Sequence, residues 1–140
     1  MIKFKNILIE SIKDKLYKDA LEFREELEDY EDWHNDKTVF KGTCQYIAKK
    51  LAEYLNKLGY TTKRIGGQYQ NVSDEFEPNM EDWDWEDKED FIDNFDNTWK
   101  HWWVEVDNKW IVDITADQFH PGEEDDYRVI ITDINDSDYK

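Results

Sequence analysis

Residues 101–115 read HWWVEVDNKWIVDIT, and the alternation of apolar residues in this stretch decides the fold. Strict alternation is typical of strands that bury one face. A three-residue loop at residues 107–109 brings the two apolar rows into register, with Val106 opposite Trp110. The stretch therefore predicts an antiparallel β-hairpin with one wholly apolar face, formed by Trp102, Val104, Val106, Trp110, Val112 and Ile114.

The same register places two polar residues on the other face of the hairpin. His101 lies opposite Thr115 and diagonal to Asp113. Diagonal neighbours on paired strands have backbones roughly 7–8 Å apart, which is within side-chain reach. A two-residue loop would instead place Asp113 on the opposite face from His101. The hydrophobic pattern therefore predicts a contact between His101 and Asp113.

Upstream, residues 42–60 read GTCQYIAKKLAEYLNKLGY, a helical pattern with Thr43 as the expected N-cap and Gly59 as the C′ glycine. Cys44 falls in the first turn, where free backbone N–H groups favour a thiolate. Because Cys44 is the only cysteine, no internal disulfide forms. It fits equally well as a small buried residue at the start of the inward stripe, which continues through Ile47, Ala48, Leu51, Leu55 and Leu58.

Cys44, His101 and Asp113 are residue types that serve as nucleophile, base and orienting group. Their setting resembles the transglutaminase-like branch of the papain-like cysteine enzymes. That family pairs a G-x-C helix start with an H-x-W-x-E-V strand and a W-x-x-x-D-x-T strand. The resemblance covers roughly residues 40–119, and Ile114 stands where the family usually has proline. The matching segments are Gly42-Thr43-Cys44, His101–Val106 and Trp110–Thr115.

The patterning and the resemblance together imply an α+β fold of the papain-like or transglutaminase-like type. A Cys-bearing helix would pack on a small antiparallel sheet of residues 101–106, 110–115 and 127–132, in one domain spanning residues 1–140. An amphipathic helix of about residues 9–31 would cover the core. The preceding segment IKFKNILI reads either as a short strand or as the first turns of that helix. The acidic tail DINDSDYK is expected to fray.

The implied activity is thiol-dependent acyl transfer at an amide or peptide bond, without a cofactor or metal. Cysteine protease, deamidase and transglutaminase remain alternatives. The backbone N–H of Cys44 is one expected oxyanion donor. Candidates for a second donor or a substrate contact are Trp33, His34, Asn35, Trp103 and Gln118. His34, His101 and His120 together with Cys44 lack the spacing of a zinc site.

The run YTTKRIGGQYQ, residues 60–70, also alternates enough to predict a strand. Residues 74–96 carry twelve acidic residues and one lysine between this strand and the one that starts at His101, so they read as an insertion. Five aromatic residues argue against simple disorder. We expect the carboxylates to attract a basic partner and the tryptophans to anchor it. A solvated loop that only aids solubility is the other interpretation. The segment also resembles a calcium-binding loop, but it lacks the glycine that such a loop requires. The candidates for partner binding are Asp82, Trp83, Asp84 and Trp85.

The net charge is −17, from 35 acidic and 18 basic residues. Such a surface repels nucleic acids and anionic membranes, so nucleic-acid binding through a basic patch is excluded. A protein or peptide substrate is expected, and the negative charge favours a basic one. No apolar run approaches the ~20 residues of a membrane span. The start has no long apolar h-region and no small-residue cleavage site, so a signal peptide is not expected there. The expected location is the cytoplasm of a bacterial or viral host cell. The alternative function is an acidic inhibitor or nucleic-acid mimic on a catalytically degenerate fold.

Overall fold

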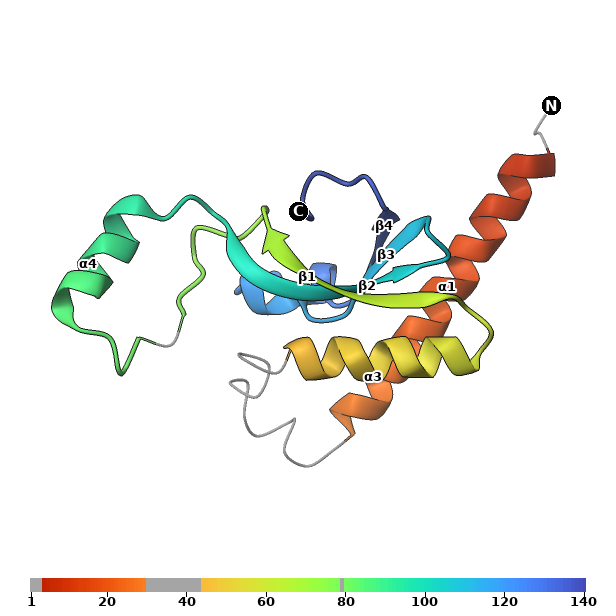
Figure 1. Cartoon of the computed structure of the whole chain (residues 1–140), viewed down its shortest axis with the longest axis horizontal. Helices are drawn as coiled ribbons and strands as arrows, with labels where there is room; N and C mark the ends of the chain where they lie inside the picture. Colours follow the sequence, from red (N-terminus) through yellow and green to blue (C-terminus); the bar gives the residue numbers. More distant parts are fainter. Residues whose placement is uncertain (1–3, 30–43, 79) are drawn as a thin grey trace.

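The computed structural model describes residues 4–29, 44–78 and 80–140, with side chains from residue 11 onward. This part of the chain forms an α+β fold with one four-stranded antiparallel sheet in the order β1-β2-β3-β4 (Figure 1). Its strands are β1 (Thr62–Tyr69), β2 (Trp99–Val106), β3 (Trp110–Asp113) and β4 (Ile130–Asp133). The helices are α1 (Phe4–Glu28), α3 (Cys44–Lys57) and α4 (Trp85–Asn94), with two 3-10 helices, η2 (Ala116–Phe119) and η3 (Glu124–Tyr127).

The hairpin of β2 and β3 has the predicted register. Val106 pairs with Trp110 and Val104 pairs with Val112 across the predicted three-residue loop. Asp107 and Asn108 both adopt φ of 54°, the left-handed region that Asp and Asn tolerate better than other side-chain-bearing residues. The loop is further tied down because the N–H of Asp107 donates to the carbonyl of Thr61 at 2.8 Å.

The two faces of the sheet are buried against different partners. The apolar face packs against α1 and α3, where it meets Leu16, Ala20 and Phe23 of the first helix and Ile47, Ala48, Leu51 and Leu55 of the second. The other face carries a mainly aromatic cluster, which includes Tyr69, Val72, Phe76, Trp103, Ile111, Phe119 and Tyr139. Both clusters remove apolar surface from water, so the middle of the sheet is covered on both sides.

Helix α3 follows its expected outline closely. Gly59 has φ of +103°, and the N–H of Tyr60 donates to the carbonyl of Leu55 at 3.2 Å, as in a Schellman C-cap. The predicted inward stripe is buried from Ile47 to Leu55. Leu58 is exposed instead, because it follows the last helical residue and the chain there is already turning toward β1.

Helix α1 begins at Phe4 and ends at Glu28, so it starts earlier than the predicted residue 9. The ambiguous segment ahead of residue 9 therefore forms helical turns from Phe4 onward. Leu16, Ala20 and Phe23 are buried, whereas Ile12 is exposed because the N-terminal turns extend past the sheet (Figure 1). None of the helices in the described ranges is long and apolar enough to cross a membrane.

A buried arginine fixes α1 to the end of the sheet. Arg24 donates to the carboxylate of Asp117 at 2.7 Å and to the backbone carbonyl of Ile114. It also pairs with Glu28, one turn along the same helix, at 2.8 Å. A buried charge is stable only when it is paired and hydrogen-bonded in this way. Arg24 thereby links α1 to the segment that follows Asp113 directly in the chain.

The C-terminal third differs from the expectation in three places. The predicted strand 127–132 is wrong at its start, because η3 occupies Glu124–Tyr127 and β4 begins only at Ile130. Strand β3 ends at Asp113 rather than at residue 115, because the chain turns there into η2. The tail does not fray: the N–H of Lys140 donates to Gln68 at 2.9 Å, and Tyr139 is buried in the aromatic cluster.

The glycine pair of β1 marks a close approach rather than a bulge. Pairing between β1 and β2 runs without interruption from Thr62 to Tyr69. A Cβ atom on Gly66 would lie 2.9 Å from the ring of Trp102, and one on Gly67 would lie 2.7 Å from the ring of Trp103. Real Cβ contacts are not that short, so two tryptophans can cover β1 only because these positions have no side chain.

Candidate active site

His101 and Asp113 form a direct side-chain pair at the end of the hairpin. Nε2 of His101 lies 2.8 Å from Oδ2 of Asp113. Both residues are only 1 % exposed. Because an ionised carboxylate only accepts hydrogen bonds, Nε2 carries the proton and donates it. The contact expected from the hairpin register is therefore present.

The carboxylate of Asp113 is held by two further groups. Its Oδ1 accepts from the backbone N–H of Thr115 at 3.0 Å, and its Oδ2 also accepts from the hydroxyl of Tyr139 at 2.9 Å. Burial acts to raise the pKa of Asp113, but the charge of His101 and these hydrogen bonds outweigh it and hold the pKa below the usual range. Asp113 is therefore an ionised, fully buried carboxylate at neutral pH.

The pKa of His101 is shifted upward, in the opposite direction to that of Asp113. Burial acts to lower the pKa of His101, but the charge and hydrogen bond of Asp113 raise it to about 9. The side chain of Cys44 raises the same pKa further, through a hydrogen-bond contribution and through its charge. His101 is therefore an imidazolium at neutral pH, stabilised from one side by a carboxylate and from the other by a thiol.

Cys44 is the first residue of α3, and its side chain is half-buried. The side chain of Cys44 raises the pKa of His101, although Nδ1 of His101 makes no hydrogen bond of full geometry with the described residues. Nε2 is already engaged by Asp113, so Nδ1 is the nitrogen left to exchange a proton with the thiol. The structure thus brings the three predicted residues together from α3, β2 and β3.

Aromatic rings hold the imidazole in place. The ring centroid of His101 lies 4.9 Å from that of Phe119, 5.9 Å from that of Tyr69 and 6.2 Å from that of Trp103. The Phe119 and Tyr69 contacts are edge-on, at 87° and 70°. Such packing excludes water and restricts rotation of the ring, so it strengthens the interaction with Asp113.

Three residues around the pair were not expected from the sequence. Tyr139 donates to Asp113, while the hydroxyl of Tyr69 lies 2.8 Å from Nε2 of His120. Burial and the charge of Asp113 both raise the pKa of Tyr69, so its hydroxyl stays neutral. His120 in turn stacks on Tyr127 at 3.4 Å between ring centroids. A lone tyrosine in a polar tail was the one local signal for Tyr139, and the sequence has none for the other two.

The candidates for a second oxyanion donor differ in whether their side-chain donors are already hydrogen-bonded. Gln118 donates its side-chain amide to the carbonyl of Thr115 at 2.9 Å. Trp103 is buried beside His101, and its indole Nε1 has no partner among the described residues. The candidates Trp33, His34 and Asn35 lie outside the described residues, as does the expected N-cap Thr43. Among the described candidates, Trp103 has an unengaged indole donor, whereas the side-chain amide of Gln118 already uses one of its two N–H groups on Thr115.

The partner-binding candidates lie on the arm that carries α4, which projects from the sheet between β1 and β2 (Figure 1). Trp83 lines a cavity there, whereas Trp85 is 77 % exposed. Asp84 is the N-cap of α4 and accepts from the N–H of Asp87 at 2.8 Å. Asp82 is exposed. These four residues are therefore set apart from the Cys44–His101–Asp113 group.

Within the parts of the chain that the structure describes, no group of three or more His, Cys, Asp or Glu side chains could hold a metal ion. Comparisons with protein-family models, with curated proteins and with solved structures give no significant match to this chain. A functional conclusion therefore depends on the residues of this site and their geometry.

Proposed function

We propose that the chain is a thiol-dependent acyl-transfer enzyme that acts on an amide or peptide bond. Cys44 is the nucleophile, His101 is the acid and base, and Asp113 orients the imidazole. The observation that carries the proposal is the buried 2.8 Å pair of His101 and Asp113, with the thiol of Cys44 acting on the same imidazole. The proposed fold is the transglutaminase-like branch of the papain-like enzymes, supported by the helix start and strand motifs around these residues.

In the first half of the reaction, the Cys44 thiolate attacks the carbonyl carbon and the carbonyl π electrons move onto oxygen. The backbone N–H of Cys44, at the helix start, donates to this oxyanion. His101 gives its Nδ1 proton to the leaving amine as the carbon–nitrogen bond breaks. The products are a thioester on Cys44, a neutral imidazole and the free amine or ammonia.

In the second half, the neutral imidazole of His101 takes a proton from the incoming water or amine. That nucleophile attacks the thioester carbonyl, and the carbon–sulfur bond breaks to restore the thiolate. Asp113 keeps the proton on Nε2 throughout, so that Nδ1 remains the exchanging nitrogen. Water gives hydrolysis or deamidation, and an amine gives transglutamination.

The elevated pKa of His101 supports this assignment. A pKa of about 9 keeps the imidazole protonated at neutral pH, so that it can give a proton to the leaving amine. A buried histidine with a purely structural role needs no such arrangement, because neutral imidazole is cheaper to bury than a charged ring. The pair therefore fits catalysis better than packing.

Alkylation kinetics test the proposal. Iodoacetamide should modify Cys44 rapidly at a pH where a free cysteine reacts slowly, because only the thiolate reacts. His101→Ala should slow this reaction, since the imidazolium no longer stabilises the thiolate. Equal rates in the wild type, in His101→Ala and in the urea-unfolded protein would contradict the proposal.

The alternative is an acidic binding protein on a degenerate enzyme fold, and the net charge of −17 favours it. In that case Cys44 would be a relic, with the alkylation rate of an ordinary thiol. The same kinetic comparison therefore separates the two functions.

A further inference from the structure

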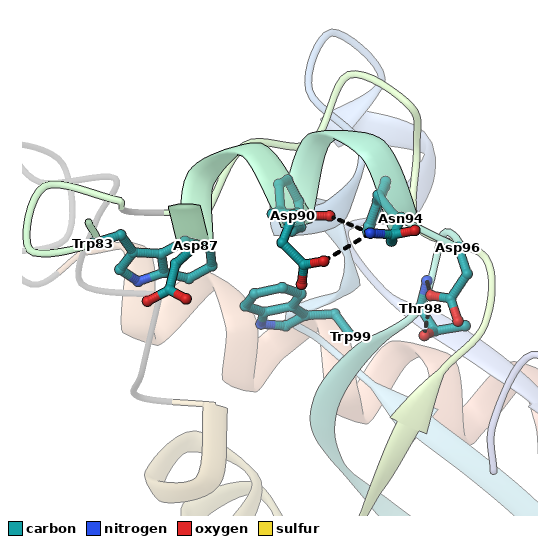
Figure 2. A pocket seen from close by; sticks show the side chains of 9 residues that line it. Trp83, Asp87, Asp90, Asn94, Asp96, Thr98 and Trp99 are labelled. Atoms are coloured by element: carbon teal, nitrogen blue, oxygen red, sulfur yellow. Dashed lines mark hydrogen bonds between the residues drawn. The ribbon is translucent and has the colours of Figure 1, made fainter. Parts of the chain in front are cut away.

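A cavity of about 420 Å³ lies beside α4 on the acidic arm, outside the Cys44–His101–Asp113 group. Figure 2 shows Asp87 and Asp90 pointing from α4 toward the side where Trp83 and Trp99 lie, with Asp96 at the far end. Cavities of this size are typical of ligand sites. Its lining combines aromatic rings with carboxylates, a combination that suits an organic cation.

The aromatic part of the lining is a continuous series of rings. Phe91 contacts Trp83 and Trp99 edge-on, at 5.9 Å between centroids in each case. Neither tryptophan is fully buried, so ring surface remains on the cavity. The faces of these rings carry partial negative charge and attract a cation within ≈ 6 Å of the centroid.

The carboxylates of the lining have no counter-ion among the described residues. None of Asp87, Asp90 and Asp96 forms an ion pair with a described residue. The carboxylate of Asp90 uses one oxygen to accept from the side-chain amide of Asn94 at 2.7 Å. A hydrogen bond from Thr98 lowers the pKa of Asp96, which therefore stays ionised at neutral pH. The other oxygens remain available to a cationic donor.

We infer that this cavity binds an arginine side chain of the polypeptide on which the Cys44 site acts, an inference that rests on the proposed function. Guanidinium is planar, so it stacks on an indole while its edge donates two parallel hydrogen bonds to a carboxylate. Trp83 or Trp99 supplies the stacking surface, and Asp87 and Asp90 supply the carboxylates. Lysine offers a single, strongly hydrated charge and satisfies only part of this lining.

The position of the cavity links it to the active site. Trp99 and His101 are two residues apart on β2 and lie on the same face, which is a separation of about 7 Å along the strand. A chain of ring contacts also joins them, from Trp99 to Phe76 at 5.4 Å, from Phe76 to Phe119 at 5.3 Å, and from Phe119 to His101 at 4.9 Å. The arginine recognised here should therefore lie within a few residues of the reacting amide.

The chain offers matched controls for both parts of the lining. Asp90→Asn removes a carboxylate of the cavity, whereas Asp93→Asn removes one from the same helix that does not line it. Both changes alter the net charge equally, and both positions are exposed. Trp83→Ala and Trp85→Ala form the corresponding aromatic pair, because Trp85 does not line the cavity.

The test measures binding to Cys44→Ala protein, in which no turnover occurs, by titration of intrinsic tryptophan fluorescence. The probes are capped glycine-rich peptides that contain glutamine and one variable residue, which is arginine, lysine or citrulline. Citrulline keeps the shape of arginine and removes its charge. We expect the arginine peptide to bind about tenfold more tightly than the citrulline peptide. Asp90→Asn and Trp83→Ala should remove most of this preference, while Asp93→Asn and Trp85→Ala should retain it.

Equal affinity for arginine and citrulline would overturn the inference. Equal losses of affinity for the arginine peptide in Asp90→Asn and Asp93→Asn would also overturn it, because only the net charge of the arm would then matter. Binding of the lysine peptide as tight as that of the arginine peptide would overturn it as well. Acylation of wild-type protein by a small uncharged amide reporter tests the proposed function separately. Reporter acylation without an arginine preference would refute the cavity alone. An arginine preference without reporter acylation would refute the proposed function and leave a guanidinium site.

Discussion

The Cys44–His101–Asp113 group, with its buried His101–Asp113 pair, and the acidic arm of residues 74–96 use carboxylates in opposite ways. Asp113 is 1 % exposed and accepts hydrogen bonds from His101, Thr115 and Tyr139. The carboxylates of the arm are exposed, and Asp87 and Asp90 have no ionic partner among the described residues. The charge that holds an imidazole in place is surrounded by hydrogen-bond donors, whereas the charges of the arm are left open to solvent.

The buried arrangement is costly in free energy. Desolvation of an ion pair can exceed the attraction between its members, so such a pair contributes little to stability by itself. Breaking it by removing one member is strongly destabilising, because the other charge is left buried and unpaired. The exposed carboxylates carry neither cost. Substitutions in the two regions should therefore differ sharply in their effects.

The largest difference should appear in turnover. Cys44→Ala and His101→Ala should each lower the rate of acyl transfer to a small amide reporter by about 10⁴-fold or more, because each removes a group that acts on the reacting atoms. Asp93→Asn, on the arm, should leave that rate unchanged. Circular dichroism should show that all three variants are folded. Undiminished turnover in Cys44→Ala would contradict the nucleophile assignment.

Asp113→Ala should have the largest effect on stability. It leaves His101 buried without its carboxylate and should lower the free energy of unfolding by about 3–5 kcal/mol. Urea denaturation measures this change. The control is Asp93→Ala, at an exposed position, whose free energy of unfolding should stay within about 0.5 kcal/mol of wild type. Asp113→Ala should also retain more activity than His101→Ala, because it orients the base rather than moving the proton. Equal stability losses at residues 113 and 93 would remove the contrast between the regions.

The pH dependence of stability should report on His101 and not on the arm. The pKa of His101 is raised from 6.5 to about 9 in the folded protein, so its contribution is fully present below about pH 6.5 and is lost as pH rises through 9. The free energy of unfolding should fall in this window by up to about 1.4 kcal/mol per pH unit. His101→Gln should lose this slope, and Asp93→Asn should keep it. A slope unchanged in His101→Gln would show that another group titrates.

Tyr139→Phe should have an intermediate effect on the free energy of unfolding. It removes the hydroxyl that donates to Asp113, a hydrogen bond to a charged group whose loss costs about 1.5–3 kcal/mol. The pKa of Asp113 is lowered in the folded protein, so its stabilisation is present above its unfolded pKa and is lost as pH falls through the folded pKa. Without Tyr139 this loss should begin at a higher pH in acid titrations followed by circular dichroism. An unchanged acid transition would contradict the contact.

The smallest effect should come from the arm itself. Asp84→Ala removes the side chain that caps α4 and should cost about 1 kcal/mol, confined to that helix. Hydrogen exchange of the α4 amides measures it, with Asp82→Ala as the control. Faster exchange in β2 or β3 would show that the arm and the active site are coupled more tightly than their separate packing indicates.

The hairpin and the helix that bears Cys44 were predictable from sequence because their signals are local. Alternation of apolar residues determines which side chains share a face, and so the pairing of His101 with Asp113 follows from loop length alone. The period of α3 and the glycine that ends it are equally local. These elements required no knowledge of the rest of the chain.

The remaining parts of the site depend on contacts between distant segments. Tyr139 reaches Asp113 only because residues 138–140 lie along the end of β1, and nothing in the tail itself indicates that pairing. The contact between Tyr69 and His120 joins residues 51 positions apart. The cavity beside α4 likewise needs Trp99, which follows the insertion and lies ahead of the strand predicted to start at residue 101.

Intact-mass spectrometry of a trapped acyl-enzyme tests the central claim most directly. Wild-type protein incubated with glutamine-containing peptides or an activated amide, and quenched with acid, should gain the mass of the acyl group. Peptide mapping should place that mass on Cys44. Cys44→Ala should show no adduct, and His101→Ala should show far less than wild type. The account would be contradicted if no adduct formed with any of these substrates and Cys44 was alkylated no faster in the folded than in the unfolded protein.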